Sequence, residues 1–252
     1  MTHRYLYLHE VIDIVGQGAE PYMAHTVDFK ADEAAGRGLE LVGTWQVVGS
    51  TGRWPQVVNL WELIDGWEGW RRLTRTTNIE RESNRPLAQW WQEAYNYRTG
   101  GLDRLLGAGP ACPTLDTLLE AGVRGELFVH EYVTVRPGST LDYLAAVAEE
   151  RRRVMADYDH ELVGAYETLL HDDEAVIVWA TDLDGQISLA QAWDAARGLG
   201  GDRISVVDDR LQAWARHSRT FVRTSRSELM TPFARSPIGA DAAPEAGLDP
   251  AG

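Results

Sequence analysis

Two short segments of the chain carry the same pair of side chains that can transfer protons, a histidine followed directly by a glutamate. The first pair, His9 and Glu10, lies in LYLHEVIDI, and the second, His130 and Glu131, lies in LFVHEYVTV. An imidazole exchanges a proton near neutral pH, and a carboxyl group does so where its surroundings shift its pKa. All four side chains are therefore candidate catalytic residues.

Both segments are predicted to be β-strands, because aliphatic residues occupy every second position on either side of the glutamate. Successive side chains of a strand point to opposite faces, so the glutamates lie on the aliphatic face and the histidines on the other. The histidine face also carries aromatic residues that we predict to bind substrate, namely Tyr7, Phe128 and Tyr132. The structural alternative is that the histidines are hydrogen-bonded wall residues and that each glutamate is paired, since an unpaired buried carboxylate is costly.

A metal site built from the two histidines and two glutamates is disfavoured by the geometry of a strand. Imidazole and carboxylate are suitable ligands for Zn, Fe or Mn. However, neighbouring residues of one strand point to opposite faces and cannot both reach one ion without a bulge. We therefore predict no metal ligands, and the sequence contains no phosphate-binding loop and no serine-hydrolase or metalloprotease motif.

The two strands begin two copies of a longer pattern, which predicts an internal duplication. LVGTWQVVG, which starts at Leu41, matches LVGAYETLL, which starts at Leu162, at the same spacing as the two His-Glu pairs. QVVNLWEL, from Gln56, likewise matches EAVIVWAT, from Glu174. Helical periodicity and a final strand complete each copy, so the predicted order is β-α-β-β-α-β, a ferredoxin-like repeat.

The predicted fold class is α+β, with two tandem ferredoxin-like repeats. A four-stranded antiparallel sheet with helices on one face leaves its other face uncovered, and a second copy can cover it. We therefore predict that the two sheets pack face to face into one α+β barrel with the helices outside and a cavity inside. Residues 1–120 form the first repeat, 121–238 the second, and 239–252 a tail whose composition predicts disorder.

Strand alternation supplies further residues that are predicted to line the cavity and bind substrate. Trp45 and Tyr166 share a register in the second strand of each repeat. In the third strands, Asn59, Trp61 and Trp179 lie opposite an aliphatic face, so they line the cavity if that face packs under the helices. The inverse assignment stays open. Such an aromatic wall suits a flat, mainly apolar ligand.

The chain resembles the NIPSNAP family within the dimeric α+β barrel superfamily. The likeness lies in VTVRPGS (133–139), LVGTWQVVGSTGRWPQVVNLWEL (41–63) and ELMTPFARSP (228–237), which look like that family's first strand and turn, hairpin and closing strand. The chain departs from the family near Glu10 and Glu131, where an arginine is usual. The resemblance implies the barrel fold and a superfamily of cofactor-free monooxygenases, cyclases, isomerases and dehydratases, beside members without known activity.

The charge of the chain disfavours some classes of binding partner. The chain has 38 acidic and 24 basic residues among 252, and its formal net charge is -14. This charge repels polyanions, so nucleic acid and anionic membranes are poor candidate partners. A single cysteine, Cys112, permits no internal disulfide, and no apolar run is long enough to span a membrane. We expect a cytoplasmic protein, either a monomer with an internal pseudo-dimer or a homodimer.

Three functions are compatible with these patterns. The first is an enzyme of secondary metabolism that binds an aromatic or polyketide-like substrate in the barrel. Without an organic cofactor, it would use His9 or His130 for proton transfer in a cyclisation, isomerisation, dehydration or O2-dependent oxidation. The second is a non-catalytic protein that carries or senses a small molecule, and the third is a structural module whose cavity is filled by Trp and Tyr. A polar cavity with a histidine favours the first, an open apolar cavity the second, and no cavity the third.

Overall fold

The two halves of the chain contain four strands each, with helices after the first and after the third strand of each half. The computed structural model describes residues 4–29, 34–81, 84–199 and 207–240. The first half consists of β1 (Leu6–Ile14), α1 (Ala19–Phe29), β2 (Leu39–Val47), β3 (Gln56–Leu63), α2 (Trp67–Thr74), α3 (Arg85–Ala94) and β4 (Arg98–Ala108). The second half consists of β5 (Leu127–Val135), α5 (Thr140–Ala146), α6 (Arg152–Ala156), β6 (Glu161–Thr168), β7 (Glu174–Thr181), α7 (Leu183–Ala196), α8 (Asp209–Ser218) and β8 (Val222–Pro232). A short helix between the halves, α4 (Leu115–Glu120), has no counterpart in this order.

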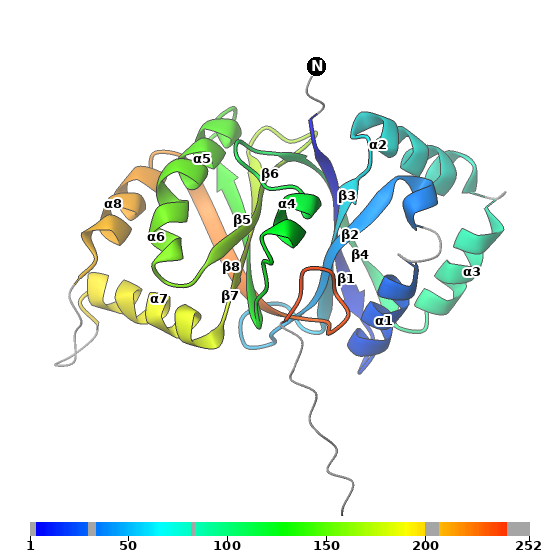
Figure 1. Cartoon of the computed structure of the whole chain (residues 1–252), viewed down its shortest axis with the longest axis horizontal. Helices are drawn as coiled ribbons and strands as arrows, with labels where there is room; N and C mark the ends of the chain where they lie inside the picture. Colours follow the sequence, from blue (N-terminus) through cyan, green and yellow to red (C-terminus); the bar gives the residue numbers. More distant parts are fainter. Residues whose placement is uncertain (1–3, 30–33, 82–83, 200–206, 241–252) are drawn as a thin grey trace, which may run out of the picture.

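The strands close into one antiparallel barrel. Around it the order is β1-β3-β2-β8-β5-β7-β6-β4. Each half contributes a sheet with the ferredoxin-like order, β4-β1-β3-β2 in the first and β8-β5-β7-β6 in the second, and the two sheets join at β2–β8 and at β4–β6. Figure 1 shows α1 to α3 and α5 to α8 on opposite outer flanks of the barrel. The predicted α+β barrel of two ferredoxin-like sheets is confirmed.

Equivalent glycines allow an aromatic ring to enter the barrel from each half. The β2–β3 and β6–β7 ladders shift register next to Gly43 and Gly164. A methyl group at Gly43 would overlap the ring of Trp45, and one at Gly164 would overlap the hydroxyl end of Tyr166. The glycines in LVGTW and LVGAY are therefore required because the rings fold back over the backbone at these bulges.

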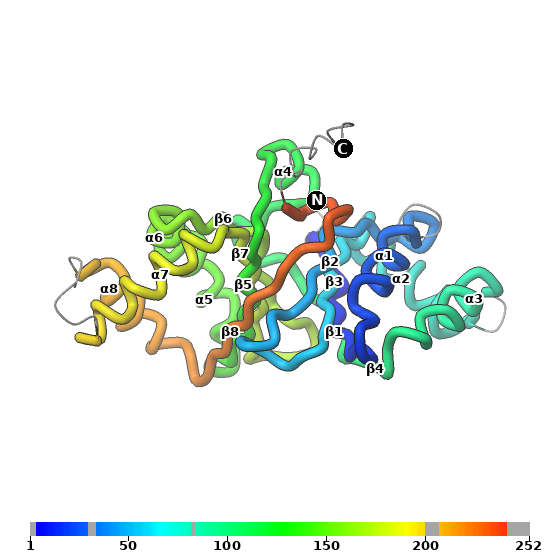
Figure 2. The backbone as a smooth tube through the Cα atoms, turned by 90° about the horizontal axis from the view of Figure 1, so that it is seen from below, coloured from blue at the N-terminus to red at the C-terminus, as the bar shows by residue number. Residues whose placement is uncertain are grey.

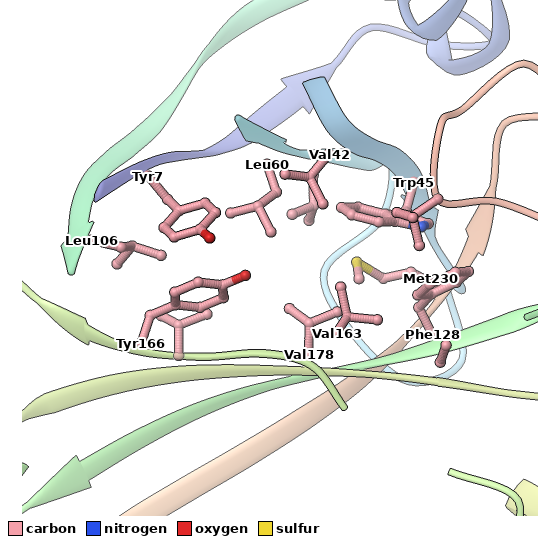
Figure 3. Packing of buried hydrophobic residues seen from close by; sticks show 14 of the residues in the cluster. Tyr7, Val42, Trp45, Leu60, Leu106, Phe128, Val163, Tyr166, Val178 and Met230 are labelled. Carbon is pink, nitrogen blue, oxygen red and sulfur yellow. The ribbon is translucent and has the colours of Figure 1, made fainter. Parts of the chain in front are cut away.

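Side chains fill much of the interior of the barrel. The inward faces of both sheets form one hydrophobic cluster that includes Tyr7, Trp45, Phe128, Tyr132 and Tyr166, all of which were predicted on this side. Figure 3 shows the rings of Tyr7 and Tyr166 facing each other from opposite sheets, and their centroids are 4.7 Å apart. These aromatic side chains pack against one another where the sequence predicted a substrate cavity.

The linker helix and the segment after β8 extend this cluster. Leu115 and Leu118 of α4 and Ile238 of the C-terminal segment belong to it, and Gly125 donates a backbone hydrogen bond to Gly239. Figures 1 and 2 both show α4 and the segment after β8 near each other beside the barrel. Most of the tail that was predicted to be disordered, from residue 241 on, lies outside the described residues. In the part of the chain that the structure describes, no helix is long and apolar enough to cross a membrane.

Two histidines form a hydrogen bond across the interior, between the two sheets. Nε2 of His9 lies 3.0 Å from Nε2 of His130, and Nδ1 of His130 lies 3.0 Å from Oε1 of Glu228. With Glu228 as the acceptor, His130 donates from Nδ1 and, as a neutral ring, accepts at Nε2, so His9 donates from Nε2. Burial lowers the pKa of both imidazoles, and Glu228 opposes only part of this effect at His130. Burial therefore favours the neutral form of both rings in the folded protein.

We predict that Gly164→Ala destabilises the protein by about 1–3 kcal/mol, because the added methyl group displaces the buried ring of Tyr166. Urea unfolding measures this loss. Gly100→Ala is the matched control, since a methyl group there meets no atom within 4 Å. Equal stability of the two variants would show that the ring does not need the glycine.

We also predict that His9→Gln makes stability less dependent on pH. The unfolded chain protonates its histidines below about pH 6.5, whereas burial lowers the pKa of both rings in the folded protein, so the free energy of unfolding falls as the solution is acidified. Each such histidine contributes a slope of up to about 1.4 kcal/mol per pH unit. Urea unfolding between about pH 7 and pH 5 measures the slope. The exposed His171, changed to Gln, is the control, and a slope as steep in His9→Gln as in the parent protein would contradict the prediction.

Candidate functional site

A pocket of about 160 Å³ lies between the outer face of the first sheet and helices α1, α2 and α3. The sheet contributes four side chains that carry polar groups, Glu10 from β1, Asn59 and Trp61 from β3, and Asp103 from β4. The helices contribute a mainly apolar wall that includes Phe29, Leu73, Leu87, Trp90 and Trp91. This combination of two carboxyl groups, one of them half-buried, with aromatic rings makes the pocket, which we call the first-half pocket, the candidate active site.

The third strands face the opposite way from the prediction. Asn59, Trp61 and Trp179 lie on the helix side of the sheets, and the aliphatic residues of β3 and β7, including Val58 and Val178, fill the barrel. The register explains the face of β3, because Asn59 lies directly opposite Glu10 and cross-strand neighbours share a face. Small aliphatic side chains fit the crowded interior, and the larger polar ones lie under the helices.

Hydrogen bonds hold the Glu10 carboxyl group in place. Its Oε2 accepts from Nε1 of Trp61 at 2.8 Å and from Nδ2 of Asn59 at 3.1 Å. Thr44 donates to Oδ1 of Asn59 at 2.7 Å, which fixes the orientation of the amide. Both bonds to Glu10 go to Oε2, so Oε1 is the oxygen that can exchange a proton with a ligand.

A second carboxyl group lies beside Glu10. Asp103 is the direct partner of Glu10 in the β1–β4 ladder, so both side chains leave the sheet on the same face. Burial raises the pKa of Glu10 to about 7, and the charge of Asp103 adds to this effect, while hydrogen bonds from Trp61 and Asn59 and the charge of Arg98 oppose it. Burial also raises the pKa of Asp103. Glu10 can therefore gain or lose a proton near neutral pH.

The pocket wall is aromatic and contains unused hydrogen-bonding groups. The ring of Phe29 lies 5.0 Å from that of Trp90 and 6.3 Å from that of Trp61, centroid to centroid. The guanidinium of Arg37 lies 5.0 Å above Phe29 and adds a positive charge. Nε1 of Trp90 and Oγ1 of Thr77 are buried and have no hydrogen-bond partner within the described part of the chain. These groups are suited to bind a flat ligand with polar substituents.

The two histidines do not reach this pocket. His9 and His130 have no exposed surface, and neither lines the first-half pocket or the two other pockets described here. Of the interior aromatic residues, Tyr132 lines a pocket of about 280 Å³ inside the barrel, together with Val11, Arg104 and Arg226, which lie on the same inward face of the strands. The structure thus separates the His-Glu pairs, with the imidazoles inside the barrel and the carboxyl groups outside it.

The equivalent glutamate of the second half has different neighbours. Glu131 forms a bidentate ion pair with Arg151, with both N–O distances at 2.5 Å, and the guanidinium lies 5.3 Å from the ring of Trp179. The partners of Glu131 in the sheet are Ile177 and Ser227, where Glu10 has Asn59 and Asp103. A buried cation therefore compensates the charge of Glu131, and the paired carboxyl groups occur in the first half.

Sequence reasoning identified Glu10, Asn59 and Trp61 as site residues, although on the wrong face for the last two, and it missed Asp103 and Arg37. The available signal for Asp103 was an acidic residue within a strand, RTGGLDRLL, directly opposite Glu10 once the strands are aligned. Arg37 ends a short 3-10 helix (Ala35–Arg37) that precedes β2, where strand alternation carries no information. Among the described residues, no three His, Cys, Asp or Glu side chains gather as a possible metal site.

No family model matches the sequence, and no curated protein matches it. Solved structures do match. An anthrone oxidase-like protein aligns with a TM-score of 0.60 at 14% identity, over 97% of both chains. A protein described as a candidate monooxygenase, from Fusobacterium nucleatum, aligns with a TM-score of 0.57 at 9% identity, over 92% of this chain and 94% of that one. A NIPSNAP domain protein from Burkholderia xenovorans covers 43% of this chain and 96% of its own at 16% identity, with a TM-score of 0.32 that is too low to support the NIPSNAP resemblance. The first two likenesses show that the chain has the α+β barrel fold.

Proposed function

We propose that the first-half pocket is the active site of an oxidase or monooxygenase that acts on a small aromatic molecule, with Glu10 as the proton acceptor. The observation that carries the proposal is a carboxyl group with a pKa of about 7 held in an aromatic-lined pocket. The pocket volume, about 160 Å³, is close to that of a cavity of about 150 Å³ that binds benzene. The names of the structural neighbours, a candidate monooxygenase and an anthrone oxidase-like protein, support an oxidative reaction.

The reaction begins with removal of a proton from an activated C–H bond. A methylene group flanked by aromatic rings or a carbonyl is acidic enough for a carboxylate base that is held next to it. When Oε1 of Glu10 takes the proton, the electron pair of the C–H bond stays on the substrate as a delocalised carbanion. This carbanion donates electrons to O2 and forms a C–O bond, and a returning proton gives a hydroperoxide. Loss of water then leaves a ketone, so one CH2 group and one O2 become one C=O group and one water.

The neighbouring side chains have distinct roles in this scheme. Trp61 and Asn59 hold Oε2 of Glu10, which directs Oε1 to the substrate. The charge of Arg37 stabilises negative charge that develops on a substrate oxygen, and the rings of Phe29 and Trp90 hold the flat substrate. The electrons come from the substrate anion, so the scheme requires no organic cofactor.

Glu10, rather than His9 or His130, is the base in this proposal. We expect Glu10→Gln to lower kcat/KM by about 100-fold or more, because the amide cannot accept the substrate proton. Oxygen uptake in the presence of single-ring aromatic compounds with acidic methylene groups, whose size fits a pocket of about 160 Å³, measures the rate. His9→Gln is the comparison variant and retains activity. Loss of activity in His9→Gln, with normal activity in Glu10→Gln, would assign the proton transfer to the imidazole.

The dependence of activity on pH tests separately whether Asp103 raises the pKa of Glu10. Activity should rise with pH through about 7, because Glu10 must be deprotonated to act as a base. In Asp103→Asn this midpoint moves to lower pH, since the negative charge of Asp103 raises the pKa of Glu10. Asp116→Asn removes the same charge from an exposed position on α4 and leaves the midpoint in place. Identical midpoints in all three proteins would exclude coupling between Glu10 and Asp103.

A further inference from the structure

The second half carries a groove of about 680 Å³ at the position that corresponds to the first-half pocket. It lies between the outer face of β5 and β8 and the helices α7 and α8, which Figure 1 shows on the flank opposite to α1–α3. We call it the second-half groove. Its lining includes Glu131 and Arg151, the ion pair that replaces the carboxyl pair of the first half.

The second-half groove is strongly positive. Five arginines line it, namely Arg151, Arg197, Arg216, Arg219 and Arg223, and Glu131 is the one carboxylate in its described lining. Arg151 is bound to Glu131, but no ion pair with a described carboxylate is formed by the other four guanidinium groups. Four exposed arginines without such a partner thus line one groove of a chain whose formal net charge is -14. Positive charges that line one groove raise its electrostatic potential and attract an anion.

Aromatic and hydroxyl groups complete the groove. Trp193 and Trp214 lie in its lining, and the guanidinium of Arg197 is 5.9 Å from the ring of Trp193. Thr224 and Ser225 add hydroxyl groups from β8. Guanidinium groups bind phosphate and carboxylate oxygens through paired N–H donors, and indole rings stack on flat groups. The lining therefore matches a ligand with several clustered oxyanions and a flat or apolar part.

The groove lacks the groups that support proton transfer in the first half. The strand partners of Glu131 are Ile177 and Ser227. In the first half the corresponding partners of Glu10 are Asn59, which donates a hydrogen bond to it, and Asp103, which raises its pKa. The remaining carboxylate, Glu131, is engaged at both oxygens by Arg151. A second copy of the proposed acid-base site is thus absent from the described lining, and the arginines require a different ligand.

We propose that the second-half groove is a binding site for a small polyanion, either a phosphate ester or a di- or tricarboxylate, separate from the first-half pocket. The oxyanions lie among Arg197, Arg216, Arg219 and Arg223, and an apolar part of the ligand packs on Trp193 and Trp214. The proposal is independent of the oxidation assigned to the first half, because it uses none of the same residues.

Isothermal titration calorimetry of the full chain with pyrophosphate, and separately with citrate, tests the site at low and constant ionic strength. Binding of one or both is expected, and the tighter probe distinguishes a phosphate site from a carboxylate site. In Arg219→Gln/Arg223→Gln the affinity should fall about tenfold or more, because two charge-assisted contacts are lost. Glu10→Gln should bind the probes as the parent protein does.

Arg124→Gln/Arg235→Gln is the matched control, since it removes two exposed arginines that lie outside the groove. It should leave the affinity unchanged. A second pair, Arg197→Gln/Arg216→Gln, covers the case in which the first double variant fails to fold. No heat with either probe would overturn the proposal. An equal loss of affinity in the control would also overturn it, because the attraction would then belong to the overall charge and not to the groove.

Discussion

Closure of the barrel at its two seams determines where chemistry can occur in this protein. Trp45–Val47 of β2 pair with Met230–Pro232 of β8, and Leu106–Ala108 of β4 pair with Tyr166–Thr168 of β6. Each seam has only three residue pairs, yet together they bring the inner faces of the two sheets into contact. Large side chains then fill much of the interior and leave a pocket of about 280 Å³ beside Tyr132, and further open space lies on the outer faces, between strands and helices. Both the first-half pocket and the second-half groove are found there.

The sequence was most informative where one face of a strand differs chemically from the other. In β1 and β5 the alternation of aliphatic residues with His, Tyr and Phe correctly separated the two faces, and the repeated LVG motif located the second strands. In β3 and β7 both faces are buried. The burial of the two faces is therefore equal, and polarity could not tell which one points inward. Asn59 lies on the helix side because its amide donates a hydrogen bond to Glu10. This contact depends on the register of β1 against β3, which the sequence of β3 alone does not show.

Other parts of the site depend on contacts that are distant in the sequence. Asp103 acts on Glu10 only because β4 pairs with β1, and Arg37 enters the pocket from a connection with no periodic pattern. How much of the predicted interior cavity stays open depends on packing for a related reason. The aromatic cluster fills part of the interior, and inward-facing residues that include Val11, Arg104 and Tyr132 line a pocket of about 280 Å³. Alternation shows which side chains point inward, but not whether the rings of Tyr7, Trp45, Phe128 and Tyr166 leave space between them. Packing of this kind follows from the distance between the two sheets.

The imidazole contact between the halves has a consequence for the fusion of the two copies. In a symmetric dimer of two identical chains, the same histidine of each chain would form this contact. Both rings would then have the same neighbouring residues. Here the residue opposite His9 in the ladder is Arg104, whereas the one opposite His130 is Glu228. Covalent linkage permits this broken symmetry, because each copy can mutate alone. One ring can thus always donate the hydrogen bond and the other always accept it. Identical subunits could not fix these two roles, because both histidines would have the same neighbours.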